Sequence, residues 1–284
     1  MKYIRLLAGD MRCSAKRTGI TLALCFVVVW LLCLGYGCAV EKAVQMGIIS
    51  GKGTVWNVAA YFMGGTKYVK MEEVQTIQFP ILWGLLYLAG LHLVCDYPFH
   101  MAEKTGMVQI LSLRSQAGWW MEKLIWTYLT LVAYVGTIVL SICCFCLYRG
   151  IPFSSGIDLQ VFEWTHVYSP AVPQSDFFWQ FHLGIGPVIV LMVLTCVQMA
   201  VSQITGPMGG FFCAVFLVGA SMAYASPWLV GNLGMVLRNR NVTDTGIDSL
   251  TAGYINGFIA AGCLIFWFAA VKIKDNLPKE REEV

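Results

Sequence analysis

The residue types that most often perform chemistry are few in this chain and widely separated. The chain has four histidines, each in a different segment: His92, His100, His166 and His182. Three cysteines in Cys143-Cys144-Phe145-Cys146 could suggest a metal site. Neighbouring cysteines on a helix point in different directions, however, and no histidine or second cysteine pair completes a tetrahedron around them. We therefore predict that the chain is not an enzyme and holds no metal or cofactor of its own.

The elements that carry these residues are long apolar runs. Of the 284 residues, 58% are hydrophobic and only 12% are charged, and the mean hydropathy is +0.67. A soluble domain carries about 25% charged residues. Six runs are about as long as a membrane-spanning helix requires, at 20–40, 77–95, 124–148, 177–198, 211–233 and 250–273. The sequence predicts an all-α protein of the cell membrane with six transmembrane helices.

The placement of positive charge predicts the orientation. Residues 1–19 are amphipathic and basic, which indicates an interfacial helix on the cytoplasmic leaflet. With both termini cytoplasmic, twelve of the nineteen Lys and Arg residues lie inside. Residues 20–273 then form one transmembrane domain, with external loops at 41–76 and 149–176. The last residues, 274–284, form a cytoplasmic tail.

The sequence offers no energy source for transport. Ion-coupled transporters need ionisable side chains within the membrane, and the centres of the six runs have none. The segment 47–54 (GIISGKGT) is similar to a phosphate-binding loop. It is one residue short between the first two glycines, and Gly53 stands where the loop requires Ser or Thr. If the chain transports, ATP and Mg²⁺ must be bound by a separate subunit.

The connection 96–123 is the most specific stretch of the sequence. An acidic residue, a glycine, a hydrophobic turn and two basic residues follow one another in it, namely Glu103, Gly106, Leu111, Arg114 and Lys123. This order resembles the permease subunits of type-2 ABC exporters, in which the Lys opens the third span. The turn 113–115 (LRS) departs from the family's usual Pro-containing turn. Length, six spans, cytoplasmic termini and the amphipathic arm agree with that family over essentially the whole chain.

The resemblance implies that a separate ABC ATPase subunit docks on this connection. A short helix can seat in a groove of a soluble partner through apolar anchors and a few orienting charges. The candidate coupling residues are Glu103, Lys104, Gly106, Met107, Ile110, Leu111, Arg114, Trp119, Trp120 and Lys123. The resemblance further implies a dimer with a second permease copy and export of an amphipathic peptide or antibiotic. The most similar families are phenol-soluble-modulin exporters and lantibiotic immunity permeases.

Other interpretations of the same residues stay open. The connection could be an ordinary positive-inside loop whose charges fix only topology. The whole chain could be a non-transporting membrane partner, such as a peptide immunity or accessory protein. A membrane enzyme is disfavoured because His100 and His166 are predicted on opposite sides of the membrane. Nothing in the sequence indicates a nucleic-acid partner.

Overall fold

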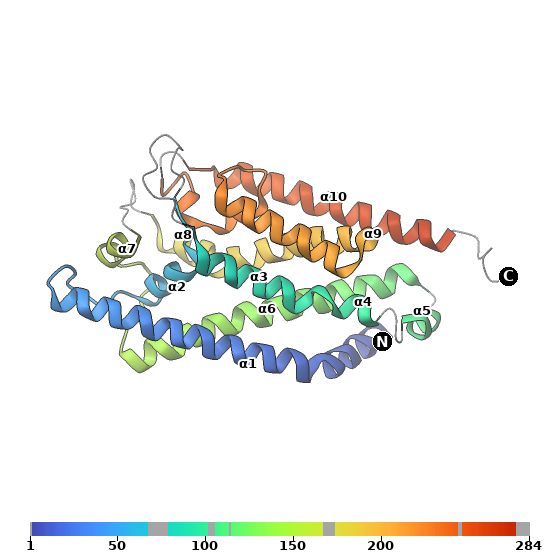
Figure 1. The fold of residues 1–284 in the computed structure, drawn as a ribbon, viewed down its shortest axis with the longest axis horizontal. Coiled ribbons are helices and arrows are strands. Elements are labelled where there is room, and N and C mark those ends of the chain that lie inside the picture. Colours follow the sequence, from blue (N-terminus) through green and yellow to red (C-terminus); the bar gives the residue numbers. More distant parts are fainter. Residues whose placement is uncertain are drawn as a thin grey trace.

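The computed structural model describes residues 2–67, 79–101, 106–113, 115–166, 174–243 and 246–276 (Figure 1). These residues form helices and turns, with one isolated bridge between Asn239 and Ile247. Five helical stretches are long and apolar enough to cross a membrane: Lys2–Gln45, Ile81–Met101, Gln116–Arg149, Asp176–Ala223 and Ser249–Ala269. The helical fold class is confirmed, and these helices have the length and composition of membrane spans.

Helices α1 (Lys2–Gln45) and α6 (Gln116–Arg149) lie side by side over most of their length (Figure 1). Each contains an uncharged stretch, at 18–40 in α1 and 124–148 in α6. At 1.5 Å per residue these stretches are about 34–38 Å long, slightly more than the hydrocarbon layer of a bilayer. Ion pairs join the two helices beyond both ends of the uncharged zone, between Asp10 and Lys123 and between Glu41 and Arg149.

Helices α3 (Ile81–Cys95) and α10 (Ser249–Asn276) pack against α9 (Gly186–Ala223). Helix α8 (Asp176–Gln180) and a π-helical turn, η3 (Phe181–Ile185), lead into α9. Gly206 interrupts α9 with φ 81° and ψ 172°, a conformation available essentially to glycine alone. The chain turns back at this break, so the two arms of α9 run in opposite directions (Figure 1).

The bundle has two different ends. Helix α1 begins and α10 ends at the same end, which also holds α4 (Tyr97–Met101) and α5 (Met107–Leu113) (Figure 1). We call this the junction end. The opposite cap end holds α2 (Val55–Met63) and α7 (Leu159–His166), which come from the two predicted external loops.

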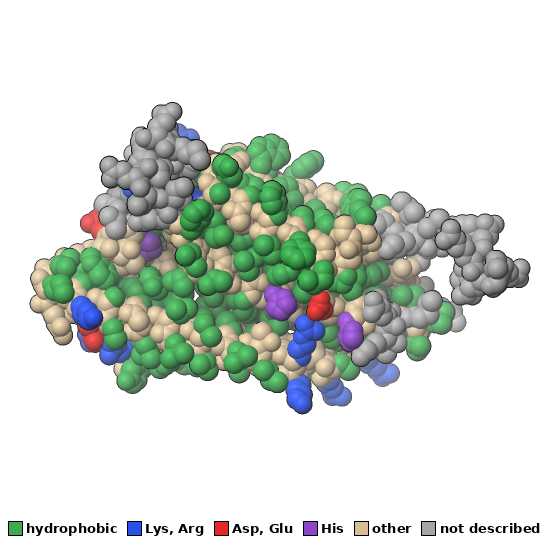
Figure 2. All heavy atoms as spheres, in the orientation of Figure 1, with side chains coloured by type: hydrophobic (Ala, Val, Ile, Leu, Met, Phe, Trp, Pro, Cys, Tyr) green, Lys and Arg blue, Asp and Glu red, His purple; other side chains and the backbone are tan. Residues whose placement is uncertain are grey.

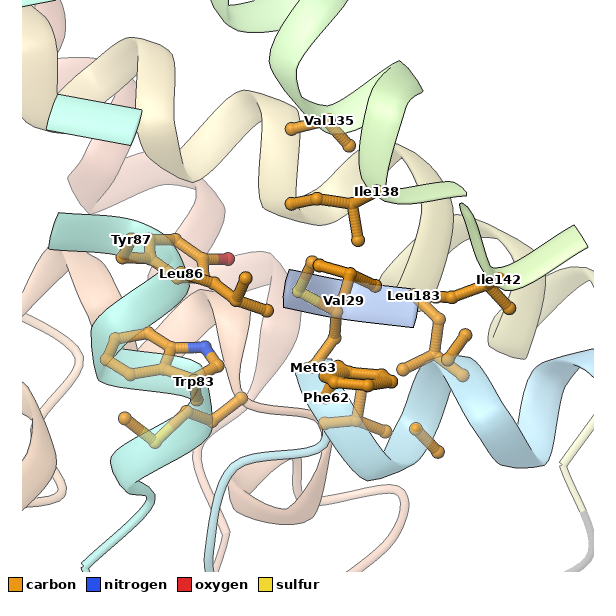
Figure 3. Packing of buried hydrophobic residues seen from close by; sticks show 14 of the residues in the cluster. Val29, Phe62, Met63, Trp83, Leu86, Tyr87, Val135, Ile138, Ile142 and Leu183 are labelled. Carbon is orange, nitrogen blue, oxygen red and sulfur yellow. The ribbon is translucent and has the colours of Figure 1, made fainter. Parts of the chain in front are cut away.

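The core between the helices is built from close apolar packing (Figure 3). Its labelled members come from five elements: Val29, Phe62, Met63, Trp83, Leu86, Tyr87, Val135, Ile138, Ile142 and Leu183. Two polar atoms in this core bond to backbone oxygens: Trp83 Nε1 donates to Gly234 O at 3.1 Å, and Tyr134 Oη donates to Leu86 O at 2.7 Å. Such bonds and van der Waals contacts hold helices together in lipid, where the hydrophobic effect between helices is absent.

The cap end is held by side chains that bond to backbone groups. Asn57 Oδ1 accepts from the backbone N–H of Thr54 and of Asp158, both at 2.9 Å, and thereby joins the two loops. His166 lies with Nδ1 3.2 Å from Phe162 O and Nε2 3.2 Å from Ala60 O. Burial lowers the pKa of His166, which favours the neutral ring.

Arg238 holds the end of α9. It lies at the end of η5 (Val236–Arg238), which follows η4 (Val230–Gly234). Arg238 is 3% exposed. Its guanidinium donates to the backbone oxygens of Met222 (2.8 Å), Tyr224 (2.9 Å), Thr66 (3.1 Å) and Ser221, and to the side-chain amide oxygen of Asn232. Three of these oxygens lie at the C-terminal end of α9, where carbonyls lack helical partners and carry partial negative charge. Burial lowers the pKa of Arg238 to about 10, so the side chain remains a cation at neutral pH.

Three predicted boundaries differ from the structure. The apolar run 211–233 is helical only to Ala223, because Pro227 and the turns around it follow. Helix α6 begins at Gln116, eight residues before the predicted span 124–148, because Ser115 caps it by accepting from Gly118 N at 3.0 Å. The arm 1–19 and the run 20–40 are not separate elements, since α1 continues through both without a break. Most of the tail 274–284 lies outside the described residues.

Candidate functional site

The predicted coupling residues fall into three groups. Glu103, Lys104 and Arg114 lie outside the described residues. Gly106 is buried, and Met107 is the first residue of α5, on which Ile110 is half-buried and Leu111 is 71% exposed. Trp119, Trp120 and Lys123 belong to the first turns of α6 and are buried. The predicted coupling surface therefore consists of two parts in the structure: the helix α5, which is partly exposed, and a buried group of side chains in the first turns of α6.

Lys123 is the centre of the buried group in the first turns of α6. Its side chain is fully buried, and its ammonium group is paired with Asp10 from α1. The ammonium also lies 3.0 Å from Glu122 Oε2 and 4.8 Å from the centroid of the Trp119 ring, which adds a cation–π contact. Removing a charge from water costs several kcal/mol, and close partners of this kind are what offset that cost. We call Asp10, Gln109, Trp119, Glu122 and Lys123 the junction cluster.

Helix α5 is tied to the junction cluster through Gln109. The Gln109 Oε1 atom accepts from Trp119 Nε1 at 2.6 Å and from Lys123 Nζ at 3.5 Å. The other side of α5 carries Val108 and Leu111, which are 72% and 71% exposed. This seven-residue helix thus presents an apolar face outward, and its inward face contacts the first turns of α6 through Gln109.

The first turns of α1 are fixed to the same place. Tyr97 Oη donates to Asp10 O at 3.1 Å, and Ser14 Oγ accepts from Trp126 Nε1 at 3.1 Å. The junction cluster and its neighbours therefore connect α1, α4, α5 and α6 at one point.

The junction cluster holds one basic and two acidic side chains, all at most 2% exposed. Burial raises the pKa of Glu122 to about 7, which favours its neutral form, whereas Asp10 is the carboxylate that pairs with Lys123. Glu122 Oε2 lies 3.0 Å from the Lys123 ammonium group, and Glu122 Oε1 has no hydrogen-bond partner among the described residues. A buried charge without full compensation makes a site sensitive to any change in its partners. The stability of the contact between α1 and α6 therefore depends on the Lys123 ammonium group.

The tryptophans do not serve as exposed anchors. Trp119 and Trp120 are 0% and 6% exposed, and they form a second apolar core with Leu124, Met199 and Trp267. Trp120 and Trp267 meet edge to face at 5.9 Å, which links α6 to α10. The chain itself covers both indoles in this structure, and their role in binding a partner stays a prediction.

Sequence reasoning missed Asp10 and Gln109. Asp10 is the only acidic residue in the arm 1–19, and it lies one helical turn from the apolar residues Leu6 and Leu7. A lone carboxylate on the apolar side of a basic helix is a detectable signal of a buried partner. Gln109 carries no comparable signal, because its role depends on how α5 folds back onto α6.

None of the four histidines is a member of the junction cluster. His92 contacts the ring of Phe211 at 5.5 Å, and His182 lies 3.1 Å from Asn239 Nδ2. Across the described ranges, no group of three His, Cys, Asp or Glu residues is arranged to hold a metal ion.

Comparison of the chain with protein-family models, with curated proteins and with solved structures finds no match.

Proposed function

We propose that the chain is the membrane-spanning subunit of an ATP-driven exporter of hydrophobic or amphipathic peptides, with ATP and Mg²⁺ bound by a separate ATPase subunit. The observation that carries this proposal is the construction of α5. Its outward face exposes Val108 and Leu111, while Gln109 ties it to the junction cluster. An element that transmits force needs both features, an apolar face for the partner and a firm link to the spans.

The proposed topology has six spans. The stretch Asp176–Ala223 has 48 residues, about 72 Å of helix, which is more than twice the thickness of the hydrocarbon layer. We assign one span to each side of the break at Gly206, and the second, 207–223, is at the short end of the usual range. Both termini then lie on the side of the membrane that holds α5 and the ATPase.

The proposed cargo pathway lies between two copies of the chain. The cavity beside Tyr36 and Arg149 and the cavity beside Asn232 and Ser249 each hold about 10 Å³, room for about one water molecule. Neither accommodates a peptide. We therefore place the proposed peptide cavity between two permeases, as the resemblance to dimeric exporters implies.

The test uses the chain together with a candidate ABC ATPase, and one encoded in a neighbouring reading frame would be the first choice. The two proteins should co-purify, and in vesicles amphipathic peptide should stimulate ATP hydrolysis and be transported. The variant V108E/L111E should bind the ATPase at least tenfold more weakly, because two carboxylates replace its apolar contacts. The control M46E/I48E changes two residues at the cap end that are 72% and 52% exposed, and it should bind normally.

Three results would contradict parts of this proposal. Equal ATPase binding by V108E/L111E and the wild type would place the docking surface elsewhere. A chain that binds peptide but no ATPase would identify a non-transporting accessory protein. Peptide transport by the chain alone would exclude a separate ATPase as the source of energy.

A further inference from the structure

The first turns of α1 have two distinct faces. The face toward the bundle carries Asp10 and Ser14, both buried. The opposite face carries Arg5, Arg12 and Lys16, all exposed. Spacings of seven and four residues place these three cations on one side of a helix. We call these three residues the basic stripe. Figure 2 shows Lys and Arg side chains gathered over this part of α1.

Among the residues that the structure describes, no acidic side chain pairs with Arg5, Arg12 or Lys16. Asp10 points into the bundle and pairs with Lys123. Asp96 lies 3.5 Å from Arg17, which is not part of the stripe. The stripe from Arg5 to Lys16 is about 17 Å long and presents its charges to the surroundings of the helix.

The position of the stripe matches the boundary of a bilayer. It ends just before the uncharged stretch 18–40, which is long enough to cross the hydrocarbon layer. Exposed apolar residues border it, with Ile4 at 73% and Met11 at 42% exposure. A helix surface that combines apolar side chains with Lys and Arg at this depth is suited to the headgroup region of a membrane.

We propose that the basic stripe binds the headgroups of anionic phospholipids in the leaflet at the junction end. The phosphate groups accept charge-assisted hydrogen bonds from Arg5, Arg12 and Lys16. Since the stripe begins five residues before Asp10 in the same helix, bound lipid would hold α1 at the depth where it meets the junction cluster. The proposal is independent of the exporter function and requires no ATPase.

The test measures lipid selectivity by electron paramagnetic resonance. The purified chain is reconstituted in phosphatidylcholine vesicles with traces of spin-labelled phosphatidylglycerol or phosphatidylcholine, and the motionally restricted fraction of each label gives its relative association. One Lys or Arg at a membrane surface contributes at most about fivefold in affinity. We expect the wild type to associate more strongly with phosphatidylglycerol than with phosphatidylcholine. In R5Q/R12Q/K16Q the ratio of the two associations should be at least about fivefold smaller. High salt should weaken the wild-type preference, because these charges are exposed.

A matched control removes three exposed cations at the cap end. The variant K42Q/K52Q/R240Q loses the same net charge and should keep the preference of the wild type. The thermal midpoint of R5Q/R12Q/K16Q should also stay unchanged, since its substituted side chains are on the surface. An unchanged lipid preference in R5Q/R12Q/K16Q would overturn the proposal. An equal loss in the control would also overturn it, because net charge and not the stripe would then set the selectivity. If R5Q/R12Q/K16Q kept its lipid preference but lost a soluble protein partner, the stripe would be a protein-binding surface instead.

Discussion

Replacing Lys123 with Met should destabilise the protein more than any other charge-removing substitution at the junction end. Met is nearly as long as Lys and keeps the packing against Trp119, but it leaves Asp10 and Glu122 buried without a cation. At an effective dielectric constant of about 20, the attraction within a close ion pair such as Lys123 with Asp10 is roughly 4 kcal/mol. Desolvation offsets much of this attraction, and removal of one partner from a buried ion pair typically costs about 3–5 kcal/mol. We expect K123M to lower the free energy of unfolding by that amount.

The assay is a titration of the purified chain with sodium dodecyl sulfate in mixed micelles, followed by far-ultraviolet circular dichroism. The neutral triple variant D10N/E122Q/K123M should recover most of the loss, because it contains no buried charge. R17Q is the control for an exposed pair: Arg17 and Asp96 are 53% and 44% exposed, and this variant should lose less than about 1 kcal/mol.

Two results would refute this reasoning. If K123M were within about 1 kcal/mol of the wild type, the junction cluster would not hold the helices together. If the triple variant were no more stable than K123M, the loss would come from altered packing, and the charge imbalance would be irrelevant.

Three further predictions concern the cap end and the turn of α9. Arg238→Met should lower the free energy of unfolding by at least about 2 kcal/mol, because several buried carbonyls lose their hydrogen-bond donor. In the same titration Arg240→Met, at an exposed position, should change the free energy of unfolding by less than about 0.5 kcal/mol. Burial lowers the pKa of His166, so below about pH 6.5 the unfolded chain binds more protons than the folded chain. The thermal midpoint should therefore be highest above about pH 6.5 and fall at lower pH. His166→Gln should flatten that pH dependence. Gly206→Ala should destabilise by about 1–3 kcal/mol, since φ 81° with ψ 172° is strained for alanine, whereas Gly219→Ala, in open space on α9, should be neutral or stabilising.

The helical elements were predictable because apolar runs leave few alternatives. The runs 77–95 and 250–273 correspond closely to α3 and α10, since each is continuous and bounded by polar residues. The turn between the fourth and fifth runs was also predictable from Gly206 and Pro207. The end of the fifth run was not, because residues after Ala223 are apolar although they form turns and short 3₁₀ helices.

The candidate site was predictable only in part. The sequence drew attention to the connection 96–123, and α5 does expose Leu111 there. It could not reveal that Lys123 pairs with Asp10, because 113 residues separate the two. It also assigned Trp119 and Trp120 to a surface, because tryptophan is common at membrane interfaces. Their burial depends on Met199 and Trp267, which reach them from distant parts of the chain.

The distribution of ion pairs indicates which parts of the bundle move together. Helices α1 and α6 are fixed to each other at both ends, by Asp10 with Lys123 and by Glu41 with Arg149. Helix α10 packs chiefly on α9 and meets α6 through the apolar contact of Trp120 with Trp267, which can slide without leaving a charge unpaired.

A pull on α5 should therefore move α1 and α6 as one body relative to α10. Spin labels at the exposed positions Leu31 in α1, Leu140 in α6 and Ile265 in α10 would measure this movement by double electron–electron resonance. If an ATPase docks on α5 as proposed, addition of nucleotide to the complex should change the Leu31–Ile265 distance and leave the Leu31–Leu140 distance constant. A change between α1 and α6 would mean that the two ion pairs do not fix their register, and the junction cluster would then be a hinge and not a rigid joint.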